Sequence, residues 1–252
     1  MELPKTTSKE LDLLLYLYKF YYLNTNQLQK LFKHKNPQGI QVWLQDLVKN
    51  GYIRYRDFDR KKFINNTKPA IYTLTRLARK KLRDNPKCEP SILNRVYQEK
   101  SNSLTFVYRQ VLLADIFLHM QAQLGKDEKL HFSTKANLVG FDYFPKPTPE
   151  AYIAIKSPKK TKRYFLYLLE EKIPMKKFEA KIHKLTDYAD NNEWAEYSKD
   201  RLPSFLIICP HETRKRQVNN LIKEAFTSGR FYLATKTSIQ LSGFKGDWKR
   251  VE

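Results

Sequence analysis

Acidic residues stand next to two predicted strands in the C-terminal half of the chain, together with one lysine. Glu150 comes just before an apolar segment at residues 151–155, and Glu170 and Lys172 follow an apolar run at residues 164–169. If the two strands are neighbours, Glu150 and Glu170 could hold a divalent cation through their carboxylate oxygens. Lys172 would then polarise the scissile phosphate or the attacking water. One interpretation of this spacing is therefore a metal site at Glu150 and Glu170, with Glu150, Glu170 and Lys172 as catalytic residues.

The same residues also fit a purely structural interpretation. Charged residues commonly close a buried strand, and a Glu-Glu-Lys triplet is frequent in lysine-rich proteins. In a strand, residues two apart point the same way, so Glu170 and Lys172 would project from one face and Glu171 from the other. The spacing alone leaves both interpretations open.

Other catalytic and metal-binding patterns are missing from the sequence. The five histidines form no HExxH motif or ligand pair, and neither a nucleotide-binding glycine loop nor a Gly-x-Ser-x-Gly elbow is present. Cys88 and Cys209 have no second cysteine or histidine at zinc spacing. We therefore interpret both as free thiols in a reducing, cytoplasmic compartment.

Apolar strands that alternate with amphipathic helices surround the acidic residues. The continuous apolar runs at residues 164–169 and 204–209 are typical of central strands covered on both faces. Helices are predicted at residues 91–124, 174–189 and 213–227, and further strands at residues 130–139 and 231–241. Strands alternating with helices predict an α/β domain over residues 86–252, with a central mixed sheet flanked by helices.

Two helices joined by a short turn are predicted in the N-terminal part. Asn24, with Gln27 three residues on, is typical of a helix start, and Gly51 is typical of a helix end. Between them, the segment 36–50 has apolar residues at the spacing of one helix face. These residues are Ile40, Trp43, Leu44, Leu47 and Val48. The pattern predicts that this second helix docks on a core along that face.

A basic two-stranded ribbon is predicted to follow. Residues 52–56 and 70–74 have strand patterns, and the loop between them is rich in Lys and Arg. The order helix, helix, helix, ribbon, helix is that of a winged helix-turn-helix. Two prolines in the polar segment 84–90 predict a boundary, so this domain is expected over residues 1–85. The whole chain is thus expected to be α+β.

The outer face of the second helix and the ribbon carry side chains that suit DNA. Glutamine can donate and accept at a base edge, and lysine or arginine pairs with phosphate. The alternative is an ordinary solvated helix face, which such residues also form. The predicted DNA-binding residues are Lys35, Asn36, Gln38, Gln41, Gln45, Lys49, Arg54, Arg56, Arg60, Lys61 and Lys62.

The charge of the chain agrees with a polyanionic partner. The sequence has 47 Lys and Arg against 26 Asp and Glu, a net charge of +21, and both halves share the excess. Attraction to phosphate should therefore contribute to binding throughout the chain. No apolar run approaches the roughly 18 residues of a membrane-spanning helix, and no signal segment opens the chain, so no membrane partner is expected.

The C-terminal order of elements, with Pro149-Glu150 opening one strand and Glu170-x-Lys172 closing the next, resembles the PD-(D/E)xK nuclease fold of restriction enzymes. From about Lys9 to Leu241, the chain is similar to the replication-relaxation family of plasmid and mobile-element proteins. That family's motifs correspond to residues 72–75 (Tyr-Thr-Leu-Thr), to residues 149–151 (Pro-Glu-Ala), and to Glu170 or Glu171 followed by Lys181 and Tyr188. Glu150 departs from the nuclease pattern, which usually has an aspartate there.

Three functions are compatible with these patterns. The first, which the resemblance implies, is a DNA-binding protein acting in replication, relaxation or mobilisation of plasmid or mobile-element DNA, with relaxosome or replication proteins as partners. The second is an endonuclease of the PD-(D/E)xK type, with Mg²⁺ or Mn²⁺ as its cofactor. The third is a winged-helix transcriptional repressor. Double-stranded DNA is the expected partner in each, and such proteins are often homodimers, although the sequence has no heptad segment.

Overall fold

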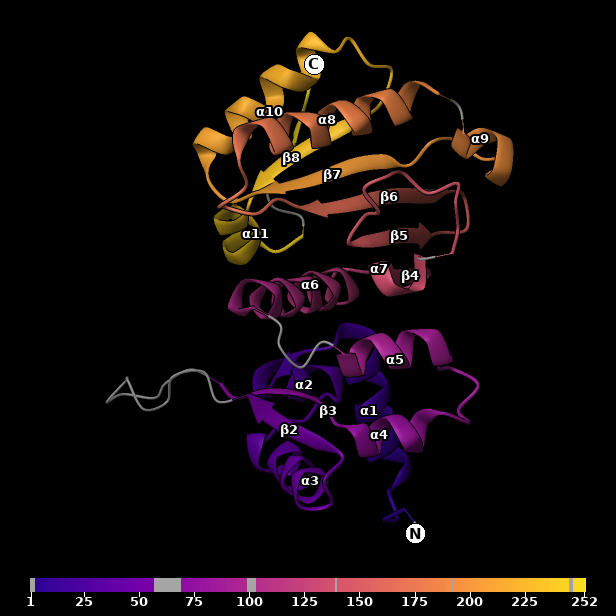
Figure 1. Ribbon diagram of the computed structural model, residues 1–252, viewed down its shortest axis with the longest axis vertical. Coiled ribbons are helices and arrows are strands. Elements are labelled where there is room, and N and C mark those ends of the chain that lie inside the picture. The colour runs from indigo at the N-terminus through magenta and orange to yellow at the C-terminus, as the bar shows by residue number, and fades with distance from the viewer. Residues whose placement is uncertain (1–2, 57–68, 99–102, 139, 192, 245–246) are drawn as a thin grey trace. The chain divides into compact units, whose positions relative to one another are not determined.

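We describe the protein from a computed structural model, which places residues 3–56, 69–98, 103–138, 140–191, 193–244 and 247–252. The chain forms two compact units, Met1–Leu118 and His119–Glu252. The division between them falls within a helix, α6 (Leu104–Ala122). Each unit has its own sheet, and the units are described separately (Figure 1).

The first unit combines helices with a small antiparallel sheet, in which β3 lies between β1 and β2. Its helices are α1 (Ser8–Phe20), α2 (Thr25–Leu31), α3 (Pro37–Lys49), α4 (Arg76–Leu82), α5 (Pro90–Gln98) and the first part of α6. Its strands are β1 (Leu23–Asn24), β2 (Ile53–Arg56) and β3 (Ile71–Leu74). The predicted order of helices and ribbon is present, and β1 is a short addition that the sequence pattern did not indicate.

Reciprocal side-chain caps fix the starts of the first two helices. Thr7 and Glu10 form a capping box at the start of α1, and Asn24 and Gln27 form one at the start of α2. The Asn24 side chain accepts a hydrogen bond from the Gln27 backbone, and the Gln27 side chain accepts one from the Asn24 backbone, both at 2.9 Å. Each pair satisfies two backbone donors that the first helical turn leaves without partners. The predicted helix start at Asn24 is confirmed.

The first unit extends past residue 85, where the sequence predicted a boundary. The Gln27 amide donates to the Val111 carbonyl oxygen at 2.7 Å and to the Asp115 carboxylate at 2.8 Å, which ties α2 to α6. The Tyr18 hydroxyl accepts from the Glu89 backbone at 2.9 Å. Because these contacts join the N-terminal helices to residues beyond position 85, the compact unit runs on to Leu118. Pro86 lies in the turn between α4 and α5, and Pro90 is the first residue of α5, so both are inside this unit.

The second unit is built on a six-stranded mixed sheet in the order β4-β5-β6-β7-β8-β9. Strands β6, β7 and β8 are parallel, and the other neighbouring pairs are antiparallel. The strands are β4 (Lys129–Thr134), β5 (Ala151–Lys156), β6 (Thr161–Leu168), β7 (Ser204–Cys209), β8 (Phe231–Thr235) and β9 (Lys249–Arg250). The helices are α7 (Lys135–Leu138), α8 (Met175–Asp190), α9 (Glu193–Ser198), α10 (Glu212–Glu224) and α11 (Lys236–Ser242).

Helices α8 and α10 lie on one face of this sheet (Figure 1). An aromatic core is buried between them and the strands. Phe165, Phe205 and Phe231 come from neighbouring strands and are buried, and the rings of Phe205 and Phe231 stack at 4.5 Å between centroids. Phe178 and Ile182 of α8 pack against them. Burying aromatic rings of this size contributes much of the hydrophobic stabilisation of a core. The predicted mixed sheet flanked by helices is thus observed.

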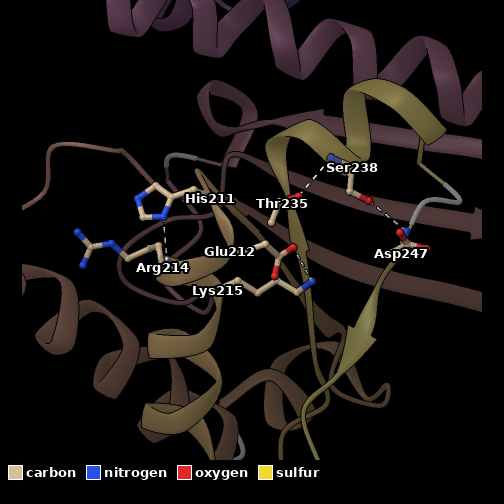
Figure 2. Close-up of polar contacts among 7 residues, drawn as sticks. All are labelled: His211, Glu212, Arg214, Lys215, Thr235, Ser238 and Asp247. Atoms are coloured by element: carbon tan, nitrogen blue, oxygen red, sulfur yellow. Dashed lines mark hydrogen bonds and ion pairs between the residues drawn. The ribbon is translucent and has the colours of Figure 1, made fainter.

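Two segments that the sequence predicted as strand ends are helices. Residues 135–138 form α7 and residues 236–242 form α11. At the start of α11, the Thr235 side chain accepts a hydrogen bond from the Ser238 backbone at 3.2 Å (Figure 2). At the start of α7, the Asn137 side chain accepts from both the backbone and the hydroxyl of Thr134. These side-chain bonds end β4 and β8 and favour the helical turn.

Candidate nucleic-acid interface and acidic site

Helix α3 is fixed at both ends and along one face. Asn36 caps its start by accepting from the Gln38 backbone at 2.9 Å, and Pro37 occupies the first turn. Gly51 follows the helix with a φ of 74°, a left-handed conformation that suits glycine and ends the helix as predicted. Ile40, Leu44 and Leu47 are buried in the core of the unit. The predicted apolar stripe therefore docks α3 on the unit, with Trp43 and Val48 half-buried at its margins.

The opposite face of α3 is exposed and mostly polar. It comprises Gln38, Gln41, Val42, Gln45, Asp46 and Lys49. Val42 is 62% exposed in the middle of this face. An apolar side chain there can contact the methyl group of thymine, so we add Val42 to the candidate residues. Val42 could have been found from the sequence, because a residue four positions after Gln38 lies on the same face of a helix.

Some candidate side chains on this face already form hydrogen bonds within the protein, and others do not. Asn36 uses its oxygen in the helix cap, and its amide donates to the Gln38 side chain at 3.2 Å. The side-chain amides of Gln41 and Gln45 have no hydrogen-bond partner within the described part of the chain. Both amides can therefore turn to a base edge without breaking a protein contact. Gln41 and Gln45 are the strongest candidates for base recognition.

The ribbon next to α3 contributes an exposed arginine. Arg54 lies opposite Thr73 in the β2–β3 pair, and its side chain is exposed, as is that of the neighbouring Tyr55. Lys35, before α3, is also exposed. Arg56 belongs to β2, but its side chain is outside the described set. The predicted residues Arg60, Lys61 and Lys62 likewise lie outside the described residues.

Replacing Arg54 by alanine should weaken DNA binding about equally for every sequence, because an arginine on phosphate reads charge and not base identity. Each lost phosphate contact should reduce the slope of log affinity against log salt concentration by about one. Salt titrations of duplex binding measure this slope. Arg216→Ala on the exposed side of α10 is the matched control, and an identical slope in both variants would remove Arg54 from the interface.

Glu150 comes directly before β5 and is buried, with an exposed fraction of 4%. Its backbone N–H donates to the Leu166 carbonyl oxygen at 2.8 Å, and its own carbonyl accepts from the Lys135 backbone at 2.8 Å. Its carboxylate contributes to raising the pKa of Tyr167, after burial and Tyr188. The residues of β6 next to Glu150 are thus Leu166 and Tyr167.

Glu170 and Lys172 do not lie where a metal site with two carboxylate ligands at the strand ends would place them. Strand β6 ends at Leu168, so Glu170 lies two residues beyond it, and Lys172 lies in the turn that follows. Both side chains are exposed, whereas Glu150 is buried. The alternation of faces expected for residues 170–172 does not apply, because these residues are not in a strand. Among the described residues, no group of three or more His, Cys, Asp or Glu side chains could hold a metal ion.

Tyr167 is buried and, by continuation of the β5–β6 register, lies opposite Glu150. Its side chain has no exposed surface, and its hydroxyl has no hydrogen-bond partner among the described residues. Burial raises the pKa of Tyr167 well above the usual value, so the hydroxyl stays protonated. The Lys181 ammonium of α8 lies 5.7 Å from the centre of its ring. Sequence reasoning treated this position only as part of an apolar strand.

Replacing Tyr167 by phenylalanine should stabilise the second unit by about 1 kcal/mol. The ring that stacks on Phe205 remains, and the change removes a buried hydroxyl whose burial without a partner costs about 1–3 kcal/mol. Chemical denaturation of both variants measures the difference. A loss of stability would instead indicate that a water molecule or Glu150 satisfies the hydroxyl in solution.

The basic run at residues 214–216 has structural roles in its first two members (Figure 2). Arg214 lies over the Phe178 ring at 4.6 Å, and Lys215 pairs with Glu212 at 3.3 Å. The His211 ring caps α10 by accepting from the Arg214 backbone at 3.2 Å. These contacts give His211, Arg214 and Lys215 structural roles, so no catalytic role is needed to explain their presence.

The two cysteines are free, as the sequence predicted, and the structure shows that both are buried. Burial raises the pKa of Cys88 to about 11 and that of Cys209 to about 12. Both thiols are therefore protonated near neutral pH, and neither is an activated nucleophile. None of the described helices has both the length and the apolar character needed to cross a membrane.

No protein-family model and no curated protein matches this chain. Two solved structures of the restriction endonuclease FokI are similar to it. The first has a TM-score of 0.34 at 12% identity, and the alignment covers 96% of this chain and 46% of that one. The second, FokI bound to DNA, has a TM-score of 0.32 at 12% identity and covers 93% and 44%. The chain thus spans less than half the length of these structures, and its function has to be argued from its own residues.

Proposed function

We propose that this protein binds double-stranded DNA and that the first unit is a winged helix-turn-helix with α3 in the major groove. The observation that carries the proposal is the exposed face of α3. Gln41 and Gln45 offer unoccupied amides at its centre, and Lys49 lies at its end. The buried residues Leu44 and Leu47 on the other side hold the helix rigidly to the unit. A fixed helix with base-reading side chains at its centre and charge at its margins suits the groove.

Charge supports the same proposal. Arg54 of the β2–β3 ribbon and Lys35 before α3 are both exposed and would reach phosphates on either side of the groove. The net charge of +21 over 252 residues adds attraction that does not depend on sequence. We therefore expect measurable binding to any duplex at low salt. Selective binding is expected only for duplexes with the bases that the side chains of α3 recognise.

Selection from a random duplex library followed by anisotropy titration tests the proposal. The full chain should enrich a defined sequence and should bind it at least about a thousand times more tightly than random duplex at physiological salt. Enrichment of no sequence, together with binding that disappears as salt is raised, would mean that the chain attracts DNA through charge alone.

We further propose that the bound site lies in plasmid or mobile-element DNA, where the protein acts in replication, relaxation or mobilisation. The similarity of residues 72–75 and 149–151 to motifs of the replication-relaxation family supports this role. Relaxosome or replication proteins would then be the partners. Mapping the selected sequence onto the DNA that carries the gene tests this: a match at an origin supports the role, and matches only at promoters support a transcriptional repressor.

A second candidate function is a Mg²⁺-dependent endonuclease. The observation that favours it is the buried carboxylate of Glu150 beside the strand that leads to Glu170. Glu150 and the exposed Glu170 would together hold the ion, which would activate water, and Lys172 would stabilise charge on the phosphate. Supercoiled plasmid should then be nicked with Mg²⁺ or Mn²⁺, but not with a chelator. Loss of nicking in both Glu150→Gln and Lys172→Ala, with DNA binding retained, identifies this function, and unchanged nicking in both variants excludes this site.

A further inference from the structure

A pocket of about 580 Å³ opens at the starts of three strands in the second unit. Thr161 begins β6, Ser204 begins β7 and Arg230 precedes β8, and all three line it. The volume falls within the roughly 300–1,000 Å³ of small-molecule sites. Because Glu170 follows the opposite end of β6, the pocket is separate from the candidate acidic site.

The wall of the pocket is basic. Five Lys and Arg residues line it, and no acidic residue of the described chain does. The five are Lys160, Lys162, Arg163, Arg201 and Arg230. Arg163 pairs with Asp200 at 2.7 Å, whereas the Arg230 guanidinium donates to the Leu202 carbonyl oxygen at 3.1 Å. That carbonyl orients Arg230 without removing its charge. The pocket therefore favours an anion, and arginine can bind phosphate through two parallel hydrogen bonds.

Aromatic rings form the other part of the wall, where Tyr164, Tyr232, Phe244 and Trp248 line the pocket. Phe244 lies 5.6 Å from Trp248 and 6.4 Å from Tyr164, measured between ring centres. The Trp248 indole N–H donates to the Phe244 carbonyl oxygen at 2.6 Å, which fixes the orientation of the indole. Rigid aromatic rings next to positive charge are suited to stack on a nucleobase.

The sheet and helix α11 hold these side chains in place. Tyr164 lies beside Ser204 in the parallel ladder, and both alternate with the phenylalanines that face α8 and α10. The pocket is thus on the sheet face away from that core. The Ser238 hydroxyl of α11 accepts from the Asp247 backbone at 3.3 Å, which anchors the chain just before Trp248 (Figure 2).

We propose that this pocket is a nucleotide-binding site. Arg201, Arg230 and Lys162 bind the phosphate, and the rings of Tyr232 and Trp248 contact the base. The nucleotide is either free or the end of a single DNA strand, since both present the same phosphate and base. The site is in the second unit and does not depend on duplex recognition by α3.

Calorimetry on the full chain at physiological salt tests the site with four probes. These are deoxyadenosine 5′-monophosphate, deoxyadenosine, inorganic phosphate and a 5′-phosphorylated single-stranded oligodeoxyadenylate. The monophosphate or the oligonucleotide should bind more tightly than deoxyadenosine and phosphate do. Arg201→Gln/Arg230→Gln should weaken that binding by about tenfold or more, since it removes charged hydrogen bonds to phosphate. Binding of the monophosphate identifies a free nucleotide, and binding of the oligonucleotide alone identifies a strand end.

The matched control is Arg216→Gln/Lys223→Gln, which removes two exposed charges from α10 on the other side of the sheet. Equal losses in the two double variants would overturn the proposal, because the effect would then come from overall charge. Failure of the wild-type chain to bind any nucleotide probe would also overturn it, as would binding of phosphate alone as tightly as the monophosphate. If the arginine variant does not fold, the exposed Lys162→Gln replaces it with the same criteria.

Discussion

Replacing Leu44 by alanine should destabilise the first unit by about 2–5 kcal/mol. Leu44 is 1% exposed at the centre of the face by which α3 docks on the core. The change removes buried methyl groups and leaves a cavity between α3 and its neighbours, which close packing fills only in part. Chemical denaturation followed by circular dichroism measures the shift. As denaturant is added, selective DNA binding should disappear together with the folded structure of this unit.

Val42 is the matched control on the same helix, because its side chain is 62% exposed. Val42→Ala should change stability by no more than about 0.5 kcal/mol, and any effect should appear in the preference for thymine-containing sites. If Leu44→Ala were as stable as the wild type, α3 would not dock through this face, and the assignment of its outer face to DNA would fail with it.

The docking of α3 could be predicted from the sequence because a helix has a regular period. Ile40, Leu44 and Leu47 recur at that period and are all buried. The start of α2 was likewise predictable, since the reciprocal cap of Asn24 and Gln27 is a local interaction. Strand β7 was predicted with the bounds that the structure has, because a fully buried strand reads as a continuous apolar run.

The candidate sites in the second unit could not be predicted in this way. Which residue of β6 lies beside Glu150 depends on strand register, and the structure places Leu166 and Tyr167 there. The sequence indicated Glu170 only because it follows the apolar run. The pocket depends on long-range pairing as well: Arg230 and Trp248 reach it from distant parts of the chain. Neither residue has local neighbours that would single it out.

Sites that rest on one helix and sites that rest on a sheet therefore differ in what a sequence can predict about them. The face of α3 follows from spacing within thirteen residues. The acidic site and the pocket require the register of several strands, which is fixed by packing across the whole unit. The short strands β1 and β9 could not be predicted from the sequence either, because a segment of two residues is too short to show a periodic pattern.

Replacing both Gln41 and Gln45 by alanine should remove most of the preference for the selected duplex over random duplex. A lost base contact costs about 1–3 kcal/mol, which is about 5- to 150-fold in affinity for each glutamine. Non-specific affinity should stay nearly unchanged, since neither residue is charged. Alanine is the best helix former and both positions are exposed, so α3 should remain intact. Anisotropy titrations with both duplexes, at one salt concentration, give the ratio of the affinity for the selected duplex to the affinity for random duplex.

Gln121→Ala/Gln240→Ala is the control, since it removes two exposed glutamines from helices α6 and α11 and should leave the ratio as in the wild type. Thermal unfolding of both double variants establishes that α3 is still folded. If the Gln41 and Gln45 variant keeps the full ratio while Arg54→Ala lowers the salt slope, the ribbon contacts DNA and α3 does not read it. Selectivity would then have to come from DNA shape or from the second unit, because charge on phosphate carries no sequence information.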